Sequence, residues 1–195
     1  MMEKPNSNSW NKNKAMGNIA ENIIEFLLNS MQDKGWSCVK YGMENHIDAL
    51  KHSIRDNNTP MSRRIRTMPD YIAINEKTNQ VILIDGKYRA FIDRRKGGIA
   101  LYGFKYGQMK DYLEFWRDIT FIVVHPHPPY FYVIDLKDVE WHKHFHSKTG
   151  ENSTLMELWN FIGIEKDIKT LFPELDDKTL KDAINLIPKS EEKQD

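Results

Sequence analysis

The chain has 195 residues, of which 40% are hydrophobic and 11% aromatic, and its formal net charge is zero. This length and composition suit one domain with a sizeable core, and the zero net charge argues against a general coat for nucleic acid. No apolar run is long enough to span a membrane, so no membrane partner is expected. Cys38 is the single cysteine, which excludes an internal disulfide framework and a four-cysteine metal site. The polar N-terminus lacks the apolar stretch of a signal peptide, and we expect a cytoplasmic protein.

The charges are distributed unevenly along the chain. Residues 151–195 contain 6 Lys, 11 Asp or Glu and no Arg, so this part carries a net −5 and residues 1–150 carry +5. Such an asymmetry is a hint of a local basic surface in the first part of the chain.

The first third of the chain predicts an arm, a helix and a strand. Residues 1–14 are polar and predict a disordered arm. From Ala15 to Asp33 the apolar residues recur at helical spacing, which predicts an amphipathic helix that Gly35 ends. The stretch WSCVKYG predicts a short strand, and residues 44–66 are polar and irregular.

A hairpin is predicted next. Asp70–Ile74 forms its first strand, NEKTN its turn, and Gln80–Lys87 its second strand. The second strand is apolar on both faces, with Val81 and Leu83 on one and Ile82 and Ile84 on the other. That pattern predicts a central strand covered on both sides.

The remaining elements predict an α/β fold. A basic glycine-containing loop (YRAFIDRRKGG) precedes a helix over 105–117, and DITFIVVH and YFYVIDL predict two strands. Further helices are expected over three ranges: 136–146, about 153–163 and about 177–187. The order predicts a core over 15–150 with a mixed central sheet flanked by helices, a C-terminal helical extension over 151–187, and a charged tail over 188–195.

The hairpin ends in a group of charged residues. Side chains alternate along a strand, so Asp85 and Lys87 leave the same face, and Asp70 on the first strand can approach Asp85. Two partly buried carboxylates repel, whereas a divalent cation such as Mg²⁺ accepts oxygen ligands from both, with the carbonyl of Gly86 as an extra ligand. Lys87 could then orient or deprotonate a water, or neutralise charge at a phosphate. An ordinary ion pair of Lys87 with either aspartate is the alternative.

These residues carry a resemblance to a known family. Pro69-Asp70 followed by Asp85-Gly86-Lys87 resembles the signature of the PD-(D/E)XK nuclease superfamily. GNIAE, Gly17 to Glu21, is similar to the G-x-x-x-E element of its RecB-like and Holliday-junction-resolvase-like branch, and QMKDY, Gln108 to Tyr112, is similar to the Q-x-x-x-Y element. The resemblance spans roughly residues 15–135, without the helicase motifs or the cysteine cluster that some relatives have.

The resemblance implies a restriction-endonuclease-like αβββαβ core and a metal-dependent nuclease. Mg²⁺ or Mn²⁺ would be held by Glu21, Asp70, Asp85 and the carbonyl of Gly86, and Lys87 would position the attacking water. Gly17 would let the first helix pack closely. The implied reaction is hydrolysis of DNA that leaves 5′-phosphate ends, and many relatives are homodimers.

Further residues are expected to support the site or to bind nucleic acid. Gln108 and Tyr112 share a helical face, with Lys105 one turn earlier, and the resemblance implies that these residues support the site and contact the phosphate backbone. The alternative is an ordinary half-exposed helix face. Basic residues flank the site on both sides and could bind phosphates: Arg63, Arg64, Arg66, Arg89, Arg94, Arg95 and Lys96. The alternative is that these charged loops are simply solvated.

Two other functions stay open at this point. One is a nucleic-acid-binding module on the same fold without activity, and the other is an enzyme that cleaves RNA with the same site. His142 and His146 would share a helical face at spacing four, but HExxH is missing and no structural zinc is expected. His125 and His127 are expected to be solvated residues at a strand end.

Overall fold

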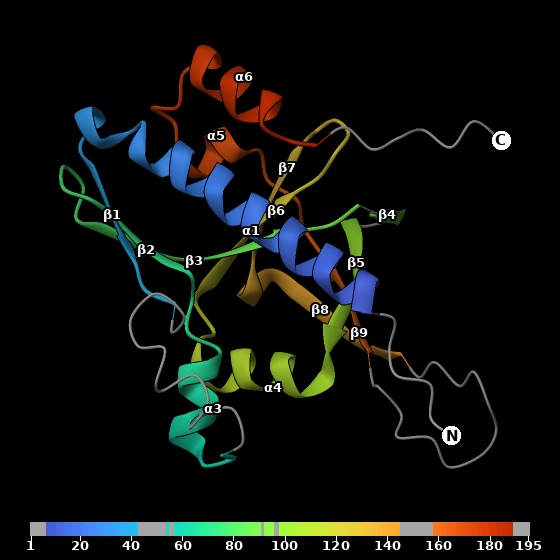
Figure 1. Ribbon diagram of the computed structural model, residues 1–195. Coiled ribbons are helices and arrows are strands. Elements are labelled where there is room, and N and C mark those ends of the chain that lie inside the picture. The colour runs from blue at the N-terminus through green and yellow to red at the C-terminus, as the bar shows by residue number, and fades with distance from the viewer. Residues whose placement is uncertain are drawn as a thin grey trace, which may run out of the picture.

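The computed structural model describes residues 7–42, 54, 57–90, 92–95, 98–144 and 158–188. These residues form two sheets with helices packed around them (Figure 1). The expected α/β class, with a mixed sheet flanked by helices, is confirmed. Within the described residues no helix is long and apolar enough to cross a membrane.

The main sheet has five strands in the order β1-β2-β3-β6-β7. They are β1 Trp36–Lys40, β2 Tyr71–Asn75, β3 Gln80–Tyr88, β6 Ile119–Val124 and β7 Phe131–Asp135. β3 pairs with β6 in parallel and all other neighbours are antiparallel. The predicted hairpin and the central position of its second strand are therefore confirmed.

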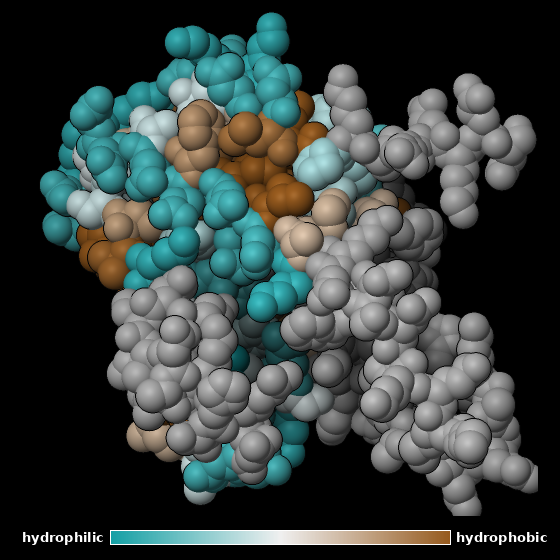
Figure 2. All heavy atoms as spheres, viewed as in Figure 1, coloured by the Kyte–Doolittle hydropathy of each residue, from teal (hydrophilic) through white to brown (hydrophobic). Residues whose placement is uncertain are grey.

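Helix α1, Ser7–Asn29, covers one face of this sheet together with two C-terminal helices, α5 Ile168–Leu171 and α6 Asp177–Asn185 (Figure 1). α1 begins at Ser7 rather than at Ala15, because the polar stretch from Ser7 to Lys14 contains neither Gly nor Pro and can extend the helix. Residues 1–6 lie outside the described part. Figure 2 shows hydrophobic side chains gathered over the region of α1 and α6, among hydrophilic surroundings.

The opposite face of the sheet is covered by helix α4, Tyr106–Phe115, and by the second sheet. Side chains alternate along β6, so Ile122 and Val124 pack on the α1 side and Phe121 and Val123 on the α4 side. On β3 the side chains are covered on both faces of the strand only after Val81, since Val81 itself is 60% exposed. Helix α3, Pro60–Arg66, lies within the segment that was expected to be irregular.

The second sheet was not predicted. Its order is β4-β5-β9-β8, with β4 Asp93–Arg95, β5 Gly98–Lys105, β8 Val139–His144 and β9 Leu158–Gly163. The predictions of helices over 136–146 and 153–163 are wrong, since these ranges hold β8, preceded by a 3₁₀ turn (η3, Leu136–Asp138), and β9. β8 and β9 pair with each other, and β9 pairs with the distant β5, so tertiary pairing overrides the local pattern in these two strands.

The C-terminal extension is therefore helical only in part. Its described residues start with β9 and continue with α5 and α6, and the latter confirms the helix expected over about 177–187. α6 begins where the side chain of Asp176 accepts a hydrogen bond from the N–H of Thr179 at 2.7 Å, which is an N-cap. Residues 189–195 of the charged tail lie outside the described part.

Candidate active site

Asp85 and Lys87 lie near the carboxyl end of β3, on the face that α4 covers. The Asp85 side chain is 2% exposed and that of Lys87 is 18% exposed. Lys87 Nζ forms an ion pair with Asp85 Oδ1, and the Tyr112 hydroxyl donates a hydrogen bond to Asp85 Oδ2. Both carboxylate oxygens of Asp85 thus have a partner, as a buried charge requires.

The Q-x-x-x-Y residues belong to this cluster. Gln108 and Tyr112 are four apart on α4, and Gln108 Nε2 lies 3.5 Å from the Tyr112 hydroxyl. The Tyr112 ring packs edge-on against Phe121 at 5.5 Å between ring centres, and Lys87 Nζ lies 5.9 Å from the Tyr112 ring centre. Two motifs whose key residues are 27 positions apart therefore meet at Asp85.

Asp70 lies just before β2, at the same end of β3. Its Oδ2 accepts a hydrogen bond from the backbone N–H of Gly86 at 2.7 Å, and its backbone carbonyl accepts one from the N–H of Tyr41 at 2.8 Å. The Asp70 carboxylate thus extends the β2–β3 ladder by one hydrogen bond and is held beside the Asp85-Gly86-Lys87 stretch.

Gly86 faces α1, the opposite side from Asp85. A Cβ built on Gly86 would lie 2.7 Å from Ile24 Cδ1, 3.5 Å from Asp70 Oδ2 and 4.0 Å from Glu21 Cα. Glu21 is anchored there, because its backbone carbonyl accepts a hydrogen bond from the Tyr71 hydroxyl at 2.9 Å. Gly86, rather than Gly17, is the glycine that permits close packing of α1.

Gly17 does not have the packing role that was expected of it. Among the described residues no atom lies within 4 Å of a Cβ built on Gly17. Glu25, one turn beyond Glu21, forms an ion pair with Lys40 at 2.7 Å. Glu21 is therefore the acid of α1 that lies beside Gly86 and Asp70.

The arginines before Asp70 differ in their surroundings. Arg63 binds Asp111 Oδ1 at 2.7 Å and Glu114 Oε2 at 3.0 Å, both on α4. Arg66 donates to the carbonyls of Ile54 at 3.2 Å and Asn57 at 3.1 Å. The side chains of Arg63 and Arg66 are therefore engaged by carboxylates and carbonyls of the protein itself.

Arg64 is the exposed arginine of α3. Its guanidinium lies 5.2 Å from the ring centre of Trp116. Of the three arginines on α3, it is the one whose position best suits a phosphate contact.

The basic residues after Lys87 are described only in part. Arg89 Nη1 donates to the Tyr88 carbonyl at 2.7 Å, and burial lowers the pKa of Arg89 to about 10, which leaves it cationic at neutral pH. The backbones of Arg94 and Arg95 lie in β4 and that of Lys105 ends β5. The side chains of these three residues, and the whole of Lys96, lie outside the described part.

The histidines do not form a metal site within the described residues. His142 lies in β8, so the helical spacing with His146 does not apply, and His146 is outside the described part. His125 Nδ1 lies 2.8 Å from the His127 carbonyl oxygen within the turn between β6 and β7. His125 is buried there rather than solvated, as its ring packs edge-on against Tyr132.

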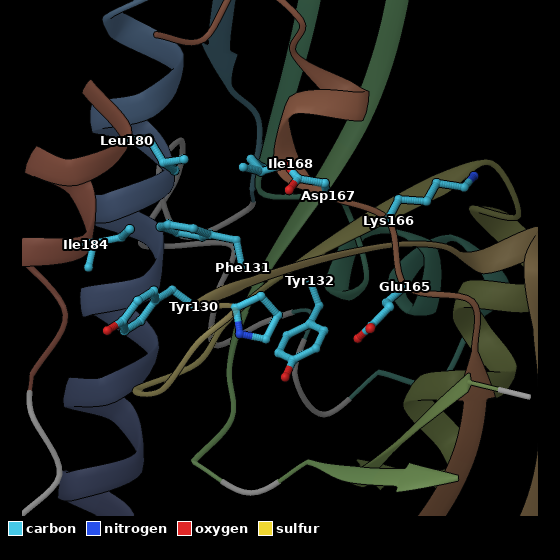
Figure 3. Close-up of a pocket in the computed structure, with 10 residues that line it drawn as sticks. Tyr130, Phe131, Tyr132, Glu165, Lys166, Asp167, Ile168, Leu180 and Ile184 are labelled. Atoms are coloured by element: carbon cyan, nitrogen blue, oxygen red, sulfur yellow. The ribbon is translucent and has the colours of Figure 1, made fainter. Parts of the chain in front are cut away.

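A pocket that the sequence did not indicate lies between β7, the segment before α5, and α6. It has a volume of about 360 Å³, and Phe131, Ile168, Leu180 and Ile184 supply its apolar lining. Figure 3 shows Lys166 of the lining directed away from the centre, and its ammonium binds Asp135 at 2.6 Å and Asp138 at 3.1 Å. This pocket holds none of the residues predicted for the site.

The fit of the predicted ligands to a divalent cation is incomplete. Carboxylate oxygens and a backbone carbonyl are the donors that Mg²⁺ takes, and Mg²⁺ needs only one or two carboxylates. Among the described residues, however, no group of three or more His, Cys, Asp or Glu side chains is arranged to hold a metal. A cation at Asp85 would take the place that the Lys87 ammonium occupies.

Comparisons with known proteins identify no family for this chain. No protein-family model matches the chain, and no curated protein matches its sequence.

Proposed function

We propose that the chain is a metal-dependent nuclease that hydrolyses phosphodiester bonds of DNA. The observation that carries the proposal is the cluster of Asp85, Lys87, Tyr112 and Gln108 at the carboxyl end of a central strand, with Asp70 held against Gly86. Buried charged groups gathered at one end of a sheet are typical of catalytic sites. The order of α1, three antiparallel strands, α4 and a parallel fourth strand supports the restriction-endonuclease-like core that the resemblance implies.

Each residue has a role in this proposal. Asp70 and Asp85 would hold Mg²⁺ or Mn²⁺, with Glu21 and the Gly86 carbonyl as the further ligands that the resemblance implies, and the ion would stabilise the negative charge on phosphate. Lys87 leaves Asp85 and positions the water whose oxygen bonds to phosphorus while the bond to the 3′ oxygen breaks. The products are a 5′-phosphate and a 3′-hydroxyl.

The neighbours of Asp85 prepare it for this role. Tyr112 donates to one carboxylate oxygen, so it fixes the direction of the other oxygen, and Gln108 contacts the Tyr112 hydroxyl from the preceding turn. A fixed carboxylate loses little conformational entropy when it binds a cation or substrate. Arg64 is the arginine of α3 that we assign to phosphate binding.

A binding module without activity is the second candidate. The observation that favours it is the closed ion pair of Asp85 and Lys87, because both charges are compensated without any metal. Such a module would bind DNA through its basic residues, and the addition of Mg²⁺ would not change which nucleic acids it binds. RNA as the substrate is a third outcome that the same test separates.

The experiment is cleavage of labelled linear duplex, single strand, flap, four-way junction, circular plasmid and RNA. Each substrate is incubated with Mg²⁺, Mn²⁺, Ca²⁺ or EDTA, and wild type is compared with Asp85→Ala and Lys87→Ala. We expect cleavage of DNA with Mg²⁺ or Mn²⁺ that EDTA and both substitutions abolish. Cleavage that survives both substitutions would rule out this site, and binding of DNA without cleavage of any substrate would favour the binding module.

A further inference from the structure

Helices α3 and α4 are joined by a set of polar contacts centred on Arg63. Its guanidinium binds Asp111 Oδ1 at 2.7 Å and spans both oxygens of Glu114, at 3.0 and 3.1 Å. It also lies 5.2 Å from the ring centre of Phe115 on the same helix. An arginine that engages two carboxylates in this way is geometrically specific, which a lysine cannot reproduce.

A second contact joins the same two helices. The indole N–H of Trp116, just past the end of α4, donates to the backbone carbonyl of Arg64 at 3.1 Å. Tyr41, just past the end of β1, packs its ring edge-on against Trp116, with 6.2 Å between the ring centres. The junction therefore fixes α4 against both α3 and the end of β1.

Each helix of the junction leads directly into the proposed site. α3 ends three residues before Pro69, and the Thr67 hydroxyl donates to the Arg63 carbonyl at 2.9 Å, which ties the residue after α3 to its last turn. On α4, Asp111 precedes Tyr112, whose hydroxyl holds Asp85. The Asp111 side chain is 11% exposed, so the loss of Arg63 would leave a nearly buried carboxylate unpaired beside Glu114.

We infer that Arg63 is a positioning residue of the site, because its contacts with Asp111 and Glu114 hold α4 in place. The Tyr112 hydroxyl then keeps its hydrogen bond to Asp85, and Asp70 keeps its position beside them. This inference rests on the proposed nuclease function. Arg63 acts through α4 and does not touch the substrate, unlike the phosphate contact that the sequence suggested for it. Its loss lowers the rate of the chemical step and leaves substrate binding almost unchanged.

The test compares steady-state cleavage by wild type, Arg63→Met, Arg63→Lys and Asp111→Asn. We expect Arg63→Met to lower kcat at least tenfold with KM within twofold of wild type, and Arg63→Lys and Asp111→Asn to lower kcat less. Lys178→Met, which removes an exposed positive charge from α6, should match wild type. A rise in KM with unchanged kcat in Arg63→Met would overturn the inference in favour of a phosphate contact, and so would wild-type values for both constants.

A second measurement does not depend on cleavage. Arg63 binds Asp111, the residue directly before Tyr112, so a positioning role predicts that the two side chains are coupled through α4. Shifts of the urea midpoint in Arg63→Met, Tyr112→Phe and the double variant should then be non-additive. Additive shifts would overturn the inference even if the protein is an active nuclease. Non-additive shifts in a protein that cleaves no substrate would support the helix coupling and reject the proposed function.

Discussion

The Tyr112 hydroxyl donates a hydrogen bond to the buried carboxylate of Asp85, although α4 and β3 are separated in the chain by the first two strands of the second sheet. The Asp85 side chain is buried, and Lys87 and Tyr112 are the partners of its two carboxylate oxygens. This relationship joins two motifs that the sequence presents separately.

Tyr112→Phe tests the hydrogen bond itself. The variant keeps the ring that packs against Phe121 but removes the donor to a buried carboxylate, so we expect a loss of about 1–3 kcal/mol in the free energy of unfolding. Tyr41→Phe, at a half-buried tyrosine that packs on Trp116, should change stability by less than about 0.5 kcal/mol. Urea unfolding measures both, and equal losses would contradict the special role of the Tyr112 hydroxyl.

Lys87→Met tests the buried ion pair. Removing the lysine leaves the Asp85 charge without its cation, and we expect a destabilisation of about 3 kcal/mol. The double variant Asp85→Asn/Lys87→Met should recover much of that loss, because it removes both charges while the new amide oxygen can still accept the hydrogen bond from Tyr112. A double variant less stable than Lys87→Met would show that the pair is not coupled as described.

Gly86→Ala tests the contact between α1 and β3. The added methyl would collide with Ile24 Cδ1, the far end of a side chain, so we expect a cost of about 1–3 kcal/mol that Ile24→Val partly relieves. Gly17→Ala is the matched control, since its Cβ meets no described atom and alanine should stabilise the helix by about 0.5–1 kcal/mol. Thermal unfolding shows whether each substitution stabilises or destabilises the protein. A stabilising Gly86→Ala would contradict the close approach of α1.

Asp135 gives a pH dependence remote from the site. Burial alone would raise its pKa, but hydrogen bonds from Lys166 and Thr120, both at 2.6 Å, hold the pKa below its ordinary value. The ionised carboxylate therefore stabilises the fold above its unfolded pKa of about 3.9, and this contribution is lost as the pH falls through the lower folded pKa.

Asp135→Asn should remove this contribution. We expect it to cost about 1 kcal/mol at neutral pH, since the ion pair is partly exposed. The difference from wild type should shrink as the pH falls below about 4. Urea unfolding at several pH values measures this, and a gap that stays constant down to about pH 2 would contradict the assignment.

The hairpin, α4 and the charged cluster could be predicted because their signals are local. β3 stands out by its continuous apolar residues, and Gln108 and Tyr112 are four apart on a helix that the sequence predicts correctly. Their convergence on Asp85 required the parallel pairing of β3 with β6, which sets α4 across the sheet.

The second sheet could not be predicted for the opposite reason. β8 mixes charged and aromatic residues and β9 mixes aromatic residues with Asn160, so neither sequence decides between helix and strand, and the pairing of β8 with β9 and of β9 with β5 decides. The same holds for Arg63, whose role depends on Asp111 and Glu114, 48 and 51 residues away. Its place in a basic cluster suggested a phosphate contact, because the chain order shows nothing of its partners.

The most direct test of the central claim is Mn²⁺ binding, followed by electron paramagnetic resonance in the presence of duplex DNA. We predict that wild type binds Mn²⁺ and that Asp70→Asn and Asp85→Asn each weaken this binding at least tenfold. Glu25→Gln, which alters an acid paired with Lys40 on the same helix as Glu21, should bind as wild type does. Wild-type protein that binds no Mn²⁺, or aspartate variants that bind it equally well, would contradict a metal-dependent site at the end of β3.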